Sequence, residues 1–191
     1  MARRPNPTLR AKRKENLMDS IIKIITEESI AEATTRHISE MSNLTIASLH
    51  YYFGSKDGAL VATGESILED WINEFFKKRT MTAEEKIRRI YAPPKYMIAF
   101  SQILTYPYRQ KKVSRKARLL DMNFTNTIKE FLKMHEIGLE NLENTTELIK
   151  TFLIGLSFKI IVNPDILDSE LENLRNFFNK KEELPDIKGF K

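Results

Sequence analysis

The stretch TIASLHYYFGSKDGAL, residues Thr45 to Leu60, places four rings side by side at residues 50–53 and then breaks at Gly54. Neighbouring residues on a helix point in different directions, so one short helix cannot bury all four rings. Leu49 and Phe53 are four residues apart and share one face, which we expect to enter a core. The other rings are then expected to point outward.

The residues around this stretch predict two short helices joined by a tight turn. Thr34 and Thr35 supply capping hydroxyls ahead of RHISEM, and the turn falls on residues 42–44. Thr45 can cap the second short helix, and Gly54 suits its C-terminal end. An amphipathic helix over about residues 9–28 precedes them. This order is the outline of a helix-turn-helix, whose second short helix lies in the DNA major groove.

Helical periodicity continues along the rest of the chain, and no segment alternates as a strand would. We expect further helices over residues 56–78, 82–91, 94–106, 110–135, 145–162 and 167–181, with prolines between several of them. The predicted fold class is all-α. Its predicted domains are a basic arm and three-helix helix-turn-helix over residues 1–55, a helical bundle over residues 56–183 and a flexible tail over residues 184–191.

The net charge of +5 on 191 residues is concentrated at the N-terminus. Its first 14 residues hold six basic side chains and no acidic one, and the remainder holds 25 basic against 26 acidic residues. Such an arm binds nucleic acid or forms a solvated tail, and charge alone does not separate the two. We include Arg10, Lys12 and Arg13 among the candidate DNA contacts on this ground.

Composition argues against several other classes of protein. The chain has no cysteine, which excludes disulfides, thiolate metal sites and thiol catalysis. Its three histidines are scattered, and no nucleophile elbow or phosphate loop occurs. No apolar run is long enough for a membrane span. We expect that the protein is not an enzyme and that it binds no metal or cofactor. We also expect no membrane partner and a cytoplasmic location.

The segment TTRHISEMSNLTIASLHYYFGSKDGAL resembles the DNA-binding signature of the tetracycline-repressor (TetR) family. The resemblance covers about Leu17 to Leu60, and the remainder of the chain has no motif to compare. Asn43 replaces the turn glycine of the family and His50 replaces a tyrosine. The resemblance implies a homodimeric repressor that a small, mostly apolar effector releases from a palindromic, double-stranded operator.

The same resemblance implies DNA contacts from the second helix, the recognition helix and the lysine that follows it. These residues are Thr35, Arg36, Thr45, Ile46, Ala47, Ser48, His50, Tyr51, Tyr52 and Lys56. Lys56 matches the lysine that binds phosphate in the family.

For the bundle, the resemblance implies an effector pocket and a dimer interface. The alternative to an effector pocket is an ordinary filled core. The alternative to a dimer interface is that the late helices complete the protomer's own core. The pocket candidates are Trp71, Phe75, Tyr96, Phe100, Gln102, Leu104, Met122, Asn123 and Phe131. The interface candidates, on two late helices with apolar stripes, are Phe152, Gly155, Leu156, Leu167, Leu171, Leu174 and Phe178.

Two other functions stay open at this point. One is a DNA-binding factor that answers to a protein partner, and the other is a helical small-molecule-binding protein or enzyme. Release of DNA by a small molecule would distinguish the sensor from both.

Overall fold

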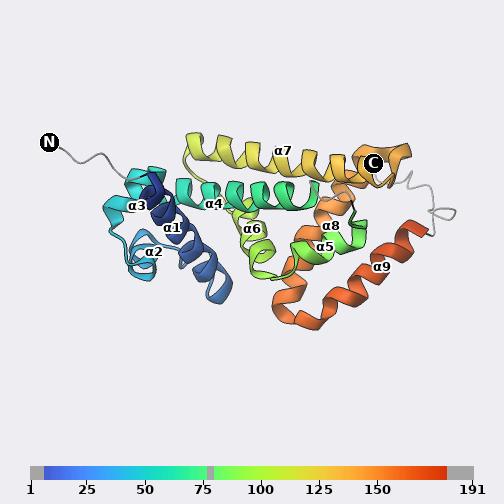
Figure 1. Cartoon of the computed structure of the whole chain (residues 1–191), viewed down its shortest axis with the longest axis horizontal. Helices are drawn as coiled ribbons and strands as arrows, with labels where there is room; N and C mark the ends of the chain where they lie inside the picture. Colours follow the sequence, from blue (N-terminus) through green and yellow to red (C-terminus); the bar gives the residue numbers. More distant parts are fainter. Residues whose placement is uncertain (1–6, 77–79, 180–191) are drawn as a thin grey trace.

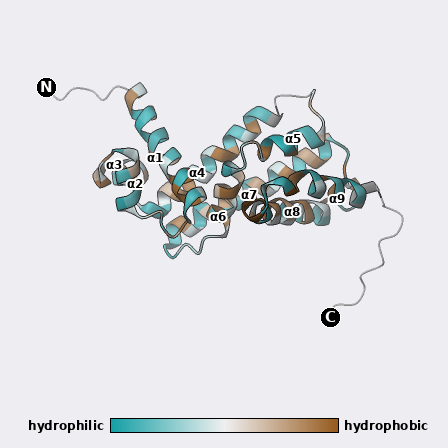
Figure 2. Cartoon of the chain, turned by 90° about the horizontal axis from the view of Figure 1, so that it is seen from below, coloured by the Kyte–Doolittle hydropathy of each residue, from teal (hydrophilic) through white to brown (hydrophobic). Residues whose placement is uncertain are grey.

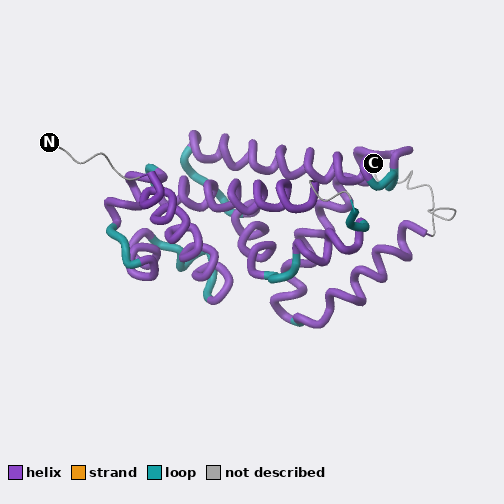
Figure 3. The backbone as a smooth tube through the Cα atoms, viewed as in Figure 1, coloured by secondary structure: helices purple, strands orange, loops and turns teal. Residues whose placement is uncertain are grey.

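The computed structural model describes residues 7–76 and 80–179, without the side chains of residues 75, 76 and 177–179. Every regular element in these ranges is a helix, which confirms the all-α prediction (Figure 3). The α-helices are α1 (Pro7–Glu27), α2 (Thr35–Ser42), α3 (Ile46–Phe53), α4 (Lys56–Trp71), α5 (Ala83–Ile90), α6 (Lys95–Thr105), α7 (Lys111–Met134), α8 (Leu142–Val162) and α9 (Leu167–Asn179). Short helical turns are η1 (Ile72–Phe76), η2 (Leu139–Asn141) and η3 (Pro164–Ile166).

Helices α1, α2 and α3 form the expected helix-turn-helix at one end of the molecule (Figure 1). Their shared core includes Leu17 and Ile21 of α1, Ile38 of α2 and Leu49 of α3, all with 0% exposure. Asn43 ends α2 in the left-handed conformation, with φ of 53°. Asparagine tolerates this conformation better than most residues, so it can take the place of a turn glycine.

The remaining helices form a bundle in which α7 lies along α4 (Figure 1) and packs against α8. Hydrophobic residues gather along α7 and α8 where the two helices meet (Figure 2). Trp71, Phe100 and Phe124 form an aromatic cluster, and the ring of Phe100 lies 4.9 Å from each of the others. Helices α5, α8 and α9 lie at the end opposite to the helix-turn-helix (Figure 1).

Helix α6 joins the two ends. It packs against α1, α4 and α8, and its Gln102 bonds to the chain near the end of α1. The Gln102 Oε1 accepts a hydrogen bond from the Ile30 amide at 3.2 Å, and its Nε2 donates to the Ile25 carbonyl at 3.4 Å. Gln102 was a candidate for the effector pocket, but in the structure its side-chain amide attaches α6 to the chain at the end of α1.

Two predicted boundaries differ from the structure. The first helix begins at Pro7, so Arg10, Lys12 and Arg13 lie on exposed turns of α1 instead of in a separate arm. Proline fits the first turn of a helix because its missing N–H would have no partner there. The predicted helix over residues 56–78 is α4 up to Trp71 and then a π-helical turn, η1. The predicted tail at residues 184–191 lies outside the described residues.

In the described residues, no helix has the length and apolar character needed to span a membrane.

The aromatic cluster predicts a large effect of truncation at Phe100, which is fully buried. We expect Phe100→Ala to lower the free energy of unfolding by about 3–5 kcal/mol, because it removes buried surface and leaves a cavity. Met122, 59% exposed on α7, is the control, and we expect Met122→Ala to change stability by less than about 0.5 kcal/mol. Urea unfolding of both variants gives the comparison, and equal effects would contradict the observed packing.

Candidate nucleic-acid interface and ligand cavity

Helix α3 buries one face and exposes the other. Leu49 is fully buried and Phe53 packs partly buried against the same core, as the spacing predicted. On the opposite face Ile46 is 43% exposed and Tyr51 is 63% exposed. Large apolar or aromatic side chains seldom remain so exposed unless they have a partner, although single cases are common. Four positions on this short helix are exposed, and they make α3 a candidate contact surface: Ile46, Ala47, His50 and Tyr51.

The hydroxyl groups at the start of α3 have a structural role. Thr45 is the N-cap, and its Oγ1 accepts a hydrogen bond from the Ser48 amide at 3.1 Å. The two hydroxyl oxygens of Thr45 and Ser48 lie 3.0 Å apart. At the other end of the helix, His50 Nδ1 lies 3.1 Å from the Gly54 carbonyl oxygen. These contacts hold the helix ends, and the hydroxyls keep further hydrogen-bonding capacity because each oxygen has two lone pairs.

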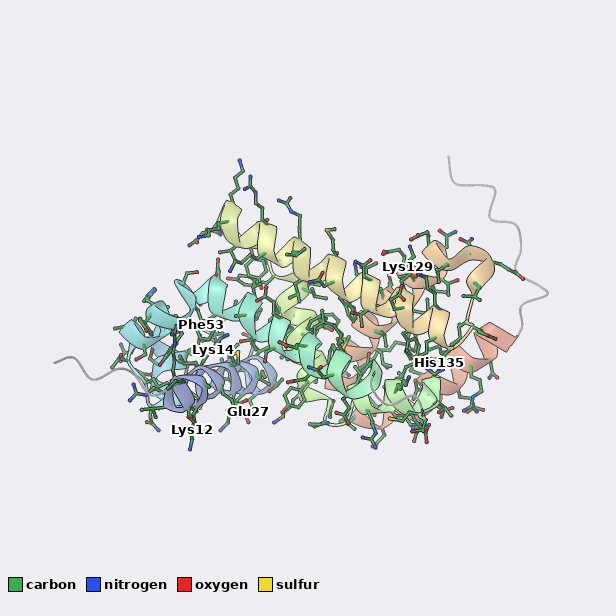
Figure 4. All side chains as sticks on the ribbon, turned by 45° about the horizontal axis from the view of Figure 1, so that its top comes forward. Lys12, Lys14, Glu27, Phe53, Lys129 and His135 are labelled. Carbon is green, nitrogen blue, oxygen red and sulfur yellow. The ribbon has the colours of Figure 1, made fainter. Side chains whose placement is uncertain are left out.

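Cations from α1 lie against the rings of α3. The guanidinium carbon of Arg10 lies 5.5 Å from the centre of the Tyr51 ring, and Lys14 Nζ lies 5.8 Å from that of Phe53. Figure 4 shows Lys14 beside Phe53, and Lys12 on the same helix. A cation over an aromatic face is attracted by the ring quadrupole. The N-terminal turns of α1 therefore add positive charge directly next to the exposed face of α3.

Lys56 was predicted to bind phosphate, but in the structure its ammonium group already has partners within the protein. Its Nζ donates a 2.9 Å hydrogen bond to the Tyr106 hydroxyl at the end of α6, and lies 3.7 Å from Asp57 Oδ1. Its side chain is 24% exposed. Arg36 on α2 is highly exposed and donates to Glu40 Oε1 at 2.8 Å, a bond that raises the pKa of Arg36. Both cations would have to leave or share these partners to bind a phosphate.

A small apolar cavity lies within the bundle between α4, α5, α7 and α8. It measures about 40 Å³, and its lining includes Trp71 and Phe131, two of the predicted pocket residues. A more open cavity of about 270 Å³ adjoins it beneath α9, and Ile87, Phe131 and Ile149 line both. The pocket is therefore largely filled by side chains in this conformation.

The other predicted pocket residues lie elsewhere. Phe100 is enclosed in the aromatic cluster, and Tyr96 and Leu104 pack partly buried on the core. Met122 and Asn123 point outward because they lie on the exposed face of α7. The side chain of Phe75 lies outside the described residues.

Sequence reasoning missed Lys86, Ile87, Ile149 and Leu153 as cavity-lining residues. Lys86 belongs to a strongly charged helix, AEEKIRRI, in which a lysine is normally exposed. Its burial depends on how α5 sits against α7, which the local sequence pattern does not encode.

Helix α8 carries an exposed apolar face. Leu148 is 43%, Phe158 44% and Val162 87% exposed, and a Cβ added to Gly155 would meet no described atom within 4 Å. Of the predicted interface residues, Gly155 is exposed, while Phe152, Leu167 and Leu174 are partly buried. Leu156 and Leu171 instead pack inside the protomer, at 2% and 5% exposure. The side chain of Phe178 lies outside the described residues.

The cap of α3 gives a stability prediction. We expect Thr45→Ala to lower the free energy of unfolding by about 1 kcal/mol, because the Ser48 amide loses its acceptor. Thr45→Ser keeps a capping hydroxyl and should remain close to the original stability. Thermal or urea unfolding measures both, and a Thr45→Ala variant as stable as Thr45→Ser would contradict the capping role.

Comparisons with known proteins agree with this geometry. No family model matches the chain. The HTH-type transcriptional regulator BetI of Burkholderia cenocepacia is 26% identical over 88 residues, which is 46% of this chain and 45% of BetI. BetI of Paraburkholderia phytofirmans is 29% identical over 91 residues, 46% of this chain and 47% of that protein. The matched region thus spans about half the length of these curated relatives.

Solved structures match over most of the chain. The fatty acid degradation regulator FadR from Bacillus halodurans has a TM-score of 0.69 at 13% identity, covering 88% of this chain and 99% of FadR. A TetR transcription regulator from Haloarcula marismortui has a TM-score of 0.66 at 16% identity, covering 88% and 97%. The chain therefore shares the fold of these regulators, one of them a TetR transcription regulator, and its sequence is similar to BetI-type regulators over about half of its length.

Proposed function

We propose that this chain is a homodimeric, DNA-binding transcriptional regulator, and specifically a repressor that a small molecule releases from its operator. The exposed ring and aliphatic side chains of α3, flanked by the cations of α1, are the observation that carries the proposal. The relationship to regulators of transcription supports it.

In this proposal the exposed face of α3 lies in the major groove. Ile46 and Ala47, in its first turn, are in the position that contacts base edges, and an aliphatic side chain there suits a thymine methyl group. Tyr51 and His50 extend from the following turn toward bases or phosphates. Arg36 and the cations of α1 neutralise phosphates, so affinity falls as salt rises. Tyr52 is partly buried against Tyr51 and Phe53 and acts mainly by holding those rings.

The exposed face of α8 supplies the dimer contact in this proposal. Leu148, Gly155, Phe158 and Val162 recur at helical spacing, so they form one stripe. Two such stripes related by a two-fold axis bury each other's apolar surface, and Gly155 permits a close approach of the helices. A two-fold dimer requires an operator with two-fold symmetry.

Effector control would act through α6, which contacts α8 on one side and α1 on the other. A ligand that enlarges the cavity beside α7 and α8 would shift α6 and, through Gln102, the end of α1. It lowers DNA affinity only as far as it prefers the conformation that does not bind DNA. One solved structure with this fold, FadR from Bacillus subtilis, is in complex with stearoyl-CoA, at a TM-score of 0.64 and 15% identity over 84% of this chain and 96% of FadR.

Substitution of Tyr51 tests the DNA interface. We expect Tyr51→Ala to weaken binding to DNA from immediately upstream of the gene by about 1–3 kcal/mol if the ring contacts a base. Binding to a scrambled duplex should change less, because phosphate contacts are independent of sequence. Fluorescence anisotropy at fixed salt measures both, with Met122→Ala as the control. Equal losses on the two duplexes would make Tyr51 a backbone contact.

A charge placed on α8 tests the dimer. We expect Phe158→Asp to convert the dimer to monomer, because two carboxylates would face each other in an apolar interface. Met122→Asp introduces the same charge at a similarly exposed position on α7 and should leave the dimer intact. Sedimentation velocity reports the mass of each. A dimer that survives Phe158→Asp would exclude α8 as the interface.

A further inference from the structure

A lysine lies buried in the apolar cavity of the bundle. Lys86 of α5 is 1% exposed and lines the cavity of about 40 Å³ together with Trp71, Phe124 and Phe131. Its Nζ donates one hydrogen bond within the described part of the chain, to the Met134 sulfur at 3.3 Å. A thioether is a weak acceptor. The ammonium group therefore has almost none of the hydrogen bonding that it would have in water.

Several other lysines of the bundle are paired with carboxylates. Lys150 Nζ lies 2.7 Å from Asp121 Oδ1, and Lys129 forms an ion pair with Glu143. Lys86 has no carboxylate within ion-pair distance among residues 7–76 and 80–179. An unpaired buried cation is costly, and burial lowers the pKa of Lys86 for that reason. An anion bound beside it would remove this cost.

A second unpartnered group lies close by. The Nε2 atom of His135, at the end of α7, is buried and has no hydrogen-bond partner in the described residues. The His135 ring packs 4.8 Å from the centre of Phe131, which lines the cavity. Lys86 Nζ bonds to the sulfur of Met134, the residue that precedes His135. Burial and the charge of Lys86 both lower the pKa of His135. A neutral imidazole with its proton on Nε2 can donate to an anion.

The walls around these groups are apolar. Apart from Lys86, Thr127 is the one polar side chain in the described lining of the inner cavity. The adjoining cavity of about 270 Å³ continues past Ile87 and Ile149 toward Leu171 and Leu174, and its two charged lining residues, Glu84 and Arg175, form an ion pair with each other. Together they offer a cationic end and a long apolar surface. Opening between them requires movement of the side chains that line both.

We propose that the effector is an alkyl carboxylate, whose acid group binds Lys86 Nζ and His135 Nε2 and whose chain occupies the apolar cavity between α5, α7, α8 and α9. The role of this ligand as a regulatory signal rests on the proposed function. Its binding to the cavity does not depend on that function. Entry of the chain separates α7 from α5 and α9. The carboxylate accepts strong hydrogen bonds from the Lys86 ammonium group, whereas the Met134 sulfur is only a weak acceptor.

Calorimetry with decanoate and 1-decanol tests the proposal on the full chain without DNA. The two ligands share an alkyl chain and differ in the head group. We expect decanoate to bind about 10- to 100-fold more tightly, since hydrogen bonds to charged groups are worth more than neutral ones. Absence of binding by decanoate, or equal affinity for the two, would overturn the proposal.

Lys86→Met and Lys133→Met form a matched pair of variants. Lys133 lines an outer groove on α7 and pairs with Glu130, and it does not line the inner cavity, so its loss removes the same charge and leaves the cavity lysine in place. We expect Lys86→Met to lose the preference for decanoate and retain decanol binding, and to unfold at an equal or higher temperature because an apolar side chain replaces a buried cation. A preference that survives in Lys86→Met, or disappears in Lys133→Met, would place the acid group elsewhere and contradict the proposal.

The same protein preparations separate this inference from the proposed function. DNA affinity is measured without ligand, and ligand affinity without DNA. Absence of a carboxylate preference in the unsubstituted protein, with its DNA binding intact, would refute the cavity assignment alone. Carboxylate binding without any DNA binding would refute the proposed regulator and leave the cavity assignment supported.

Discussion

The short helix α3 can bury only one of its faces, and this constraint governs the helix-turn-helix end of the molecule. Leu49 occupies the small core beside Ile38 and Ile21, so Tyr51 and Ile46 must lie on the opposite, exposed face. The caps at Thr45 and Gly54 fix where the helix begins and ends. Arg10 and Lys14 of α1 then lie over the rings. A rigid surface with aromatic, aliphatic and cationic groups results, and it suits the major groove.

The two ends of the molecule are joined by few polar contacts. Gln102 attaches α6 to the chain after α1, and Lys56 at the start of α4 bonds to Tyr106 at the end of α6. Figure 4 shows His135 at the end opposite to Phe53 and Lys14. In the proposed regulation, a signal from the cavity would travel along α4, α6 and α7, which pack against one another. A shift of α6 would move both of these contacts, the one between Gln102 and the chain after α1 and the one between Tyr106 and Lys56.

Local sequence patterns predicted the helices and the helix-turn-helix well, because caps, turn residues and apolar spacing are local signals. Thr34, Asn43 and Thr45 are found in their predicted roles. The cavity was predicted poorly, because burial of Lys86 and outward placement of Met122 depend on how distant helices meet. Leu156 and Leu171 are an intermediate case. Periodicity identified their apolar stripes but could not decide whether the protomer or a partner covers them.

In vitro selection from a random duplex library tests the central claim most directly. If α3 reads bases from a two-fold dimer, the selected sequences should converge on a palindrome. Its half-sites should be centred about 34–36 Å, or a multiple of one helical turn, apart. The Tyr51→Ala protein should select a weaker or altered half-site. Recovery of sequences without a consensus, or of one asymmetric site unaffected by Tyr51→Ala, would contradict the account.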